Sequence, residues 1–169
     1  TANKDRPFFG QLALIAPHLP AYPHQPFAGR PDAGAYGDVV AEIDSIVGRL
    51  LVKLQELNLD RDTLVVFTSD NGPWFEGSTG GLRDRKGGTG YDGGYRVPFI
   101  ARQPGIVPAG KTVDSIAMAI DLLPTFCRMA GKPLPKGVVL DGKDITDVLL
   151  RGARSPHDAL LLFDDDAVV

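Results

Sequence analysis

Side chains able to bind a metal and an anion follow one apolar run in this sequence. Asp70 and Asn71 come directly after residues 63–68, and a glycine-rich loop carrying Lys86 comes next. Oxygen ligands beside a cation, on a backbone that can approach closely, suit a hard metal ion and an oxyanion. By themselves, Asp70 and Asn71 are more typical of a turn that ends a strand, and Lys86 of a solvated loop charge.

The run ahead of Asp70 predicts a strand that positions these groups. Residues 63–68 are β-branched, aromatic and uncharged, the pattern of a strand buried on both faces as in a parallel sheet. The Asp-Asn-Gly-Pro sequence at 70–73 then ends the ladder. Ligands of open α/β sheets bind at the carboxyl ends of the strands, so Asp70 and Asn71 are expected at a binding edge.

Strands and helices alternate along the rest of the chain. Residues 36–57 carry an apolar stripe with period 3.6 and predict an amphipathic helix. A second helix is expected over 122–130, with Asp121 as its N-cap, and a short one over 147–151. Strands are expected at 7–16, 96–101 and 158–163, while 112–119 is ambiguous between a short strand and a loop. This alternation predicts an α/β fold with a largely parallel sheet.

Length and composition exclude several classes of protein. The chain has 169 residues and is 43% hydrophobic, which fits one globular domain. A net charge of −3 offers no basic surface for nucleic acid. No apolar run is long enough to span a membrane. The single cysteine, Cys127, forbids an internal disulfide, and we expect it to pack as a small hydrophobe in the 122–130 helix.

Five ordered blocks extend over almost the whole chain. They are Ala-Pro-His-Leu-Pro at 16–20, Tyr-Gly-Asp at 36–38, Thr-Ser-Asp-Asn-Gly-Pro at 68–73, Tyr-Asp-Gly-Gly-Tyr-Arg-Val-Pro at 91–98 and Asp-Leu-Leu-Pro-Thr at 121–125. Asp-Asn-Gly alone is weak evidence, but the blocks together and in this order resemble the type I sulfatases of the arylsulfatase A and N-acetylgalactosamine-6-sulfatase kind.

The resemblance implies a fold and a chemistry. The family has an alkaline-phosphatase-like fold, a three-layer α/β/α arrangement with a mixed, largely parallel sheet. It cleaves sulfate esters with a calcium ion and a formylglycine made from cysteine or serine. Matching positions imply that Asp70 and Asn71 bind calcium, and that His18 hydrogen-bonds the sulfate or protonates the leaving alkoxide. Lys86 would neutralise a sulfate oxygen, and Trp74 is expected to line the substrate pocket.

Two departures from the family pattern affect these expectations. The nucleophile motif, Cys or Ser-x-Pro or Ala-x-Arg, is absent from the sequence. We therefore expect residues 1–169 to be a partial domain, the C-terminal portion of the catalytic core, whose last residues lead into a C-terminal subdomain and which is inactive alone. The interval from Lys86 to Gly93 is about one residue longer than the family pattern. Lys86 could thus be displaced, with Arg83 or Arg85 in its place.

The remaining polar residues receive weaker assignments. His24 is expected at the surface and His157 in solvent, and Asp92 with Arg96 fits a structural salt link as well as a catalytic task. By resemblance, the partners are a sulfate ester or sulfated sugar and the remainder of the same chain, in a periplasmic, secreted or lysosomal compartment. Two other functions stay open: a phosphoesterase or phosphonate hydrolase of the alkaline phosphatase superfamily, and a non-catalytic module on the same scaffold.

Overall fold

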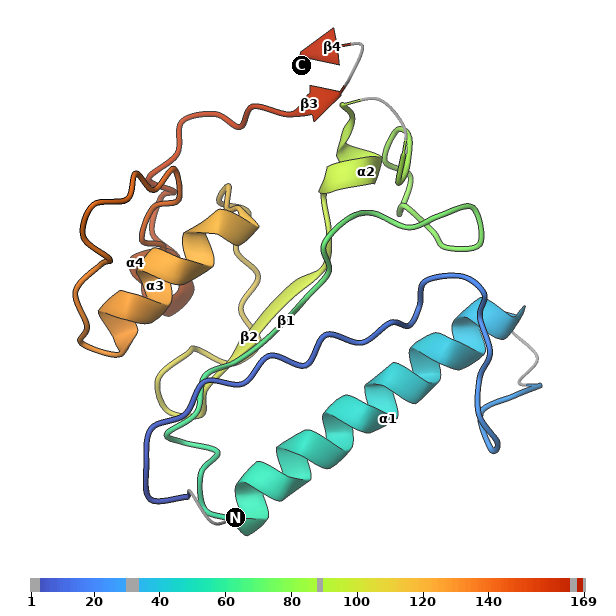
Figure 1. The fold of residues 1–169 in the computed structure, drawn as a ribbon, viewed down its shortest axis with the longest axis horizontal. Helices are drawn as coiled ribbons and strands as arrows, with labels where there is room; N and C mark the ends of the chain where they lie inside the picture. The colour runs from blue at the N-terminus through green and yellow to red at the C-terminus, as the bar shows by residue number, and fades with distance from the viewer. Residues whose placement is uncertain (1–3, 30–33, 88–89, 165–166, 169) are drawn as a thin grey trace. The chain divides into compact units, whose positions relative to one another are not determined.

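A computed structural model describes residues 4–29, 34–87, 90–164 and 167–168 (Figure 1). The chain divides into two compact units, Thr1–Thr63 and Leu64–Val169. The expectation of one partial domain over 1–169 stays a prediction. The elements are α1 (Gly34–Glu56), β1 (Val65–Thr68), α2 (Asp92–Tyr95), β2 (Phe99–Arg102), η1 (Ala119–Asp121), α3 (Leu122–Met129), α4 (Thr146–Arg151), β3 (Phe163–Asp164) and β4 (Ala167–Val168).

Helix α1 dominates the first unit and confirms the helix expected over 36–57. Its buried apolar residues, Val39, Ile43 and Leu54, fall on the predicted stripe. Asp38 is buried at the start of this helix, where its carboxylate accepts a hydrogen bond from the Gly29 amide at 2.8 Å. No helix in the described ranges is both long and apolar enough to cross a membrane.

The strand expected over 7–16 is not formed. This segment is irregular in the structure, and its apolar side chains lie open, with Phe9 76% and Ile15 88% exposed. A strand needs a neighbour to satisfy its backbone N–H and C=O groups, and these residues have no ladder partner within the described part of the chain. The apolar run was therefore insufficient to predict a strand.

The strand predicted before Asp70 exists, but not in the predicted environment. β1 pairs with β2 in antiparallel register, with Val65 opposite Arg102 and Thr68 opposite Phe99. The half-exposed Phe67 shows that β1 is not buried on both faces, so this part of the prediction was wrong. β2 itself begins directly after Pro98, close to the strand predicted over 96–101. Residues 112–119 contain no strand, and the strand expected over 158–163 is found only from Phe163 onward.

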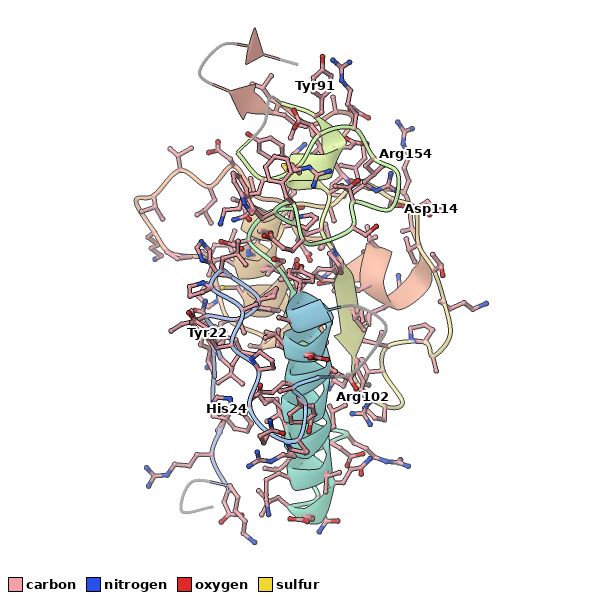
Figure 2. All side chains as sticks on the ribbon, turned by 90° about the vertical axis from the view of Figure 1, so that its right-hand side faces the viewer. Tyr22, His24, Tyr91, Arg102, Asp114 and Arg154 are labelled. Atoms are coloured by element: carbon pink, nitrogen blue, oxygen red, sulfur yellow. The ribbon has the colours of Figure 1, made fainter. Side chains whose placement is uncertain are left out.

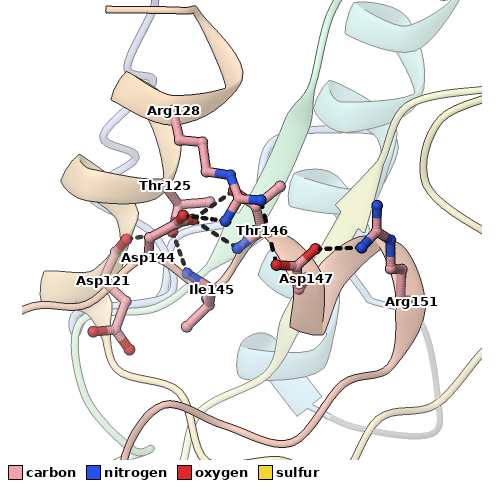
Figure 3. A network of polar contacts seen from close by, with 8 residues as sticks. All are labelled: Asp121, Thr125, Arg128, Asp144, Ile145, Thr146, Asp147 and Arg151. Atoms are coloured by element: carbon pink, nitrogen blue, oxygen red, sulfur yellow. Dashed lines mark hydrogen bonds and ion pairs between the residues drawn. The ribbon is translucent and has the colours of Figure 1, made fainter. Parts of the chain in front are cut away.

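A polar core joins α3 to the segment before α4 in the second unit. Thr125 is fully buried, and its hydroxyl donates to the Asp121 carbonyl oxygen at 2.6 Å. The same hydroxyl accepts from the amide of Ile145, which is 1% exposed, at 3.0 Å (Figure 3). The buried Thr125 hydroxyl thus both donates and accepts a hydrogen bond, as a buried polar group requires. Gly131 ends the α3 region at a φ of +63°, as its position after the helix predicted.

Asp121 and His157 form a buried pair that corrects two expectations. Asp121 makes no side-chain cap for α3. Its Oδ2 accepts from the Met118 amide at 2.7 Å, and its Oδ1 accepts from the Lys143 amide and from His157 Nε2, both at 2.8 Å. The side chain of His157 is only 5% exposed, so its assignment to solvent was wrong. The carboxylate thus connects three segments of the second unit.

An ion-pair network extends this core to the surface. Arg128 on α3 reaches Asp144 at 2.6 Å and Asp147 on α4 at 3.3 Å, and Arg151 pairs with Asp147 at 3.2 Å (Figure 3). Partial burial raises the pKa of Asp144, but hydrogen bonds from Thr146 and Arg128 outweigh it and hold that pKa below its ordinary 3.8. The same contact with Asp144 raises the pKa of Arg128.

The lowered pKa of Asp144 predicts acid sensitivity. A carboxylate whose pKa is depressed on folding adds stability above its unfolded pKa, here 3.8, and this contribution is lost as pH falls through the folded value. We expect the unfolding temperature to fall as pH drops below 3.8, and Asp144→Asn to show a shallower fall. Thermal unfolding followed by circular dichroism at several pH values measures this. Parallel curves for both proteins would contradict the assignment.

Candidate functional site

The predicted metal-binding residues lie on the turn after β1. Asp70 is exposed, and Asn71 is half-buried. The Ser69 hydroxyl donates to the Asn71 carbonyl oxygen at 3.1 Å and contacts Asp70 Oδ1 only at 3.4 Å. Among the described residues, the Asp70 carboxylate has this one weak side-chain contact, and it is exposed, so its oxygens can bind an external cation.

Glycines fix this turn against the segment that contains α2. The Gly72 amide donates to the Gly94 carbonyl oxygen at 2.8 Å, and a Cβ at Gly72 would lie 1.9 Å from the Gly93 carbonyl oxygen. The Gly93 amide in turn donates to the Arg83 carbonyl oxygen at 2.8 Å. Side chains at these positions would separate the two backbones, so the Tyr-Asp-Gly-Gly block holds the turn in place.

The backbone of Lys86 is also hydrogen-bonded to the segment that contains the Asp70 turn. Its amide donates to the Pro73 carbonyl oxygen at 3.1 Å, which ties the lysine loop to the end of the Asp70 turn. Lys86 is half-buried. The Asp70–Asn71 pair and Lys86, which the sequence predicted to act together, thus come from adjoining loops of one unit.

The two arginines considered in place of Lys86 have other contacts. The Arg83 guanidinium lies 3.6 Å from the centroid of the Tyr91 ring, and that of Arg85 lies 4.6 Å from the Phe75 ring. Sequence reasoning missed these pairs, although arginines near aromatic residues are a usable signal. Figure 2 labels Tyr91 in this region. Lys86 has neither an aromatic nor an acidic partner in the described part of the chain.

Trp74 connects the Asp70 turn with the lysine loop. Its ring meets Phe75 edge to face, with centroids 4.9 Å apart and planes at 90°. Its Cζ3 lies 3.4 Å from where a Cβ would stand on Gly87, so the indole rests against that glycine. Trp74 is nevertheless 43% exposed. A rigid aromatic with an open face beside a turn is suited to contacting a ligand.

His18 belongs to the first unit and lies in the loop that follows residues 7–16. It is exposed, and its Nδ1 lies 2.7 Å from the Leu19 carbonyl oxygen. A carbonyl can only accept, so Nδ1 carries a proton and Nε2 is the acceptor of the neutral ring. His18 also lines a hollow of about 220 Å³ between the 14–24 segment and α1.

His24 is a surface residue, as expected. Its side chain is 82% exposed, and its Nδ1 lies 2.8 Å from Glu42 Oε1 (Figure 2). The His24 amide donates to Glu42 Oε2 at 3.0 Å, and this bond, followed by the ring contact, lowers the pKa of Glu42. The pair fastens the loop to α1 and leaves His24 without an evident chemical task.

The other candidates have structural positions. Asp92 and Arg96 form a long ion pair of 4.0 Å between largely exposed groups, which fits the salt-link interpretation. Cys127 is a free, half-buried thiol on α3. In the described ranges no three His, Cys, Asp or Glu side chains gather closely enough to hold a metal ion. Asp70 and Asn71 are two oxygen-bearing side chains, fewer than the about six to eight oxygen ligands that calcium takes.

Curated proteins similar to this chain are sulfatases. Human arylsulfatase A is 41% identical over 165 residues, covering 95% of this chain and 32% of the relative. The N-acetylgalactosamine-6-sulfatase of the dog is 41% identical over 153 residues, covering 87% of this chain and 29% of the relative. The chain thus spans about a third of the length of these relatives.

Solved structures show the same relation. A sulfatase from glycosaminoglycan metabolism in Bacteroides thetaiotaomicron matches with a TM-score of 0.86 at 28% identity, over 95% of this chain and 36% of that one. A protein solved with its substrate D-glucosamine-2-N,6-O-disulfate matches with a TM-score of 0.61 at 30% identity, over 79% and 27%. A phosphonate monoester hydrolase from Silicibacter pomeroyi matches with a TM-score of 0.55 at 30% identity, over 75% and 23%.

These neighbours confirm the predicted α/β class and the alkaline-phosphatase-like fold. The Sulfatase family model matches residues 1–132, most of the chain. The match includes the Asp70 turn, the lysine loop and the His18 loop. The chain therefore belongs to the sulfatase family.

Proposed function

We propose that this chain is part of a sulfuric ester hydrolase and supplies half of a calcium site together with sulfate-binding groups. Family membership supports hydrolysis of sulfate esters as the reaction. The observation that carries the assignment of residues is the backbone connection of Lys86 to the turn of Asp70 and Asn71. With these groups held on adjoining loops, Asp70 and Asn71 could bind a metal ion and the Lys86 ammonium could bind an anionic substrate on that metal.

Asp70 and Asn71 fit calcium by their donor chemistry. Calcium takes about six to eight oxygen ligands, and a solvent-facing carboxylate beside an amide oxygen offers two of that kind. Bound there, calcium would supply positive charge for the oxygens of the sulfate group. The remaining ligands and the formylglycine would come from residues other than those of this chain, which lacks the Cys or Ser-x-Pro or Ala-x-Arg motif.

The chain's own groups act by binding charge and moving a proton. The Lys86 ammonium would neutralise a sulfate oxygen as negative charge develops there. His18, whose Nδ1 donates to the Leu19 carbonyl, can hold a second proton at Nε2. That proton would hydrogen-bond the sulfate or pass to the leaving alkoxide. Without a nucleophile, residues 1–169 alone should release no phenol from an aryl sulfate in the presence of calcium.

Replacing Asp70 tests the metal role. In the protein that carries this chain together with the formylglycine segment, Asp70→Ala should lower kcat/KM for an aryl sulfate at least about 100-fold, because one calcium ligand is lost. Calcium affinity measured by titration should fall in parallel. Asp114→Ala removes an exposed carboxylate elsewhere and should leave both values unchanged. Full activity in the Asp70 variant would refute the assignment.

Trp74 should affect substrate binding more than the chemical step. Trp74→Ala removes an exposed ring next to the Asp70 turn, so KM should rise about fivefold with little change in kcat. Steady-state kinetics on an aryl sulfate measure both constants. Phe8→Ala, which removes the 56% exposed Phe8, serves as the comparison. An unchanged KM would remove Trp74 from the substrate pocket.

Two other functions are tested by the same preparations. The similarity to a phosphonate monoester hydrolase favours a second candidate, a phosphonate or phosphate ester hydrolase with the same metal geometry. Faster turnover of a phenyl phosphonate than of the aryl sulfate would select it. A protein that neither binds calcium nor hydrolyses either ester would instead be a non-catalytic module.

A further inference from the structure

Two arginines shortly precede the candidate sulfate-binding lysine in the same loop, and each lies over an aromatic ring. The Arg83 guanidinium is 3.6 Å from the Tyr91 ring centroid, and the Arg85 guanidinium is 4.6 Å from that of Phe75. Phe75 in turn packs edge to face against Trp74. Arg85 therefore contacts the Trp74–Phe75 pair that adjoins the Asp70 turn, while Arg83 lies over a different ring, that of Tyr91.

Neither arginine is neutralised within the described residues. Arg83 is exposed and Arg85 half-buried, and neither forms an ion pair in the described part of the chain. The intervening Asp84 uses its Oδ1 to accept the Arg85 amide at 2.9 Å. Residues 83–86 thus carry three cations and one carboxylate, an excess of positive charge in a loop that also bears the candidate sulfate ligand.

A guanidinium over a ring is oriented as well as charged. The contact with the ring limits where each guanidinium can lie, and its planar fork of N–H donors matches the oxygens of an oxyanion. Stacking also limits the rotamer entropy that an arginine would otherwise lose on binding. Such groups are suited to holding an anion and are less suited to the proton transfer expected of His18.

We propose that Arg83 and Arg85 form a second anion subsite beside Lys86, which binds a sulfate group of the substrate other than the ester to be cleaved. This inference rests on the proposed function and narrows its substrate to sugars carrying at least two sulfates. The disulfated glucosamine bound by one structural neighbour supplies a suitable probe.

Binding of two sugars tests the subsite without turnover. Titration calorimetry would use the full-length protein with its formylglycine precursor left unconverted, and D-glucosamine-2-N,6-O-disulfate and D-glucosamine-6-O-sulfate as ligands. We expect the wild type to bind the disulfate more tightly. Arg83→Gln and Arg85→Gln should each raise Kd for the disulfate about fivefold, and change Kd for the monosulfate less than about twofold.

Matched variants separate recognition from loop support. Phe75→Leu removes the ring under Arg85 without changing charge, and it should weaken disulfate binding less than Arg85→Gln does. Arg85→Lys keeps the charge and should retain part of the disulfate affinity that Arg85→Gln loses. Arg49→Gln, on the exposed surface of α1, should change nothing. Equal wild-type affinity for the two sugars, or an equal loss for both in the arginine variants, would overturn the subsite. Aryl sulfate hydrolysis by the converted wild type reports separately on the proposed function.

Discussion

Gly93→Ala should disrupt the backbone contacts that hold the Asp70 turn against the α2 segment and should abolish activity. A Cβ at this position would lie 1.9 Å from the Asp84 carbonyl oxygen and 2.5 Å from that of Arg83. Both are backbone atoms, so the clash can be relieved only by moving the lysine loop away from α2. We expect a loss of roughly 3 kcal/mol in the free energy of unfolding, the upper range for overpacking.

The measurements are thermal unfolding of residues 1–169 and aryl sulfate turnover in the full-length protein. A cost of roughly 3 kcal/mol corresponds to a fall in Tm of about 10 °C for a chain of this size. Gly48→Ala is the matched control, because a Cβ there meets nothing within 4 Å and Gly48 lies inside helix α1. It should be neutral or raise stability by about 0.5–1 kcal/mol, since alanine favours helix. Similar behaviour of the two variants would refute the close packing at Gly93.

This packing shows what sequence reasoning can and cannot reach. The Asp-Asn-Gly-Pro turn was identified from local chemistry, and its place after a strand was predicted correctly. That Gly72, Gly93 and Gly94 bring two distant loops into backbone contact depends on tertiary structure. A glycine in a loop is compatible with a positive φ, a close approach or simple flexibility, and the sequence does not distinguish these.

The helices and strands also differ in how well the sequence predicts them. α1 was predictable because its apolar stripe repeats over six turns, and an amphipathic helix satisfies its own backbone. The segment over 7–16 failed because a strand requires a neighbour. β1 was placed correctly, but its antiparallel partner and half-exposed surface were not, since an apolar run does not reveal the direction of its neighbour.

Ionisable residues were the least predictable. His157 and Asp121 were assigned from local sequence to solvent and to a helix cap, and the structure buries both in one hydrogen-bonded pair. They lie 36 residues apart, and no periodic pattern connects them. Arg83 and Arg85 were considered as replacements for Lys86, whereas their aromatic contacts point to a separate role.

Asp121→Asn should be the most destabilising substitution of an ionisable residue in the second unit. Asp121 is fully buried and accepts three hydrogen bonds, one at Oδ2 from Met118 and two at Oδ1 from Lys143 and His157. An asparagine has one oxygen, so in either orientation its NH₂ group faces a backbone amide that can only donate. We expect a cost of roughly 3–4 kcal/mol from the unsatisfied buried donors.

The next residue after His157 supplies the control for this experiment. Asp158 is 90% exposed and pairs with Arg154, itself 86% exposed, so Asp158→Asn should change Tm by less than about 2 °C. The Asp121 variant should lose about 10 °C in the same thermal scan. Equal Tm values would mean that the carboxylate is not the acceptor of all three donors. A large difference would show that it is this buried charge that joins η1, the Lys143 loop and the segment after α4.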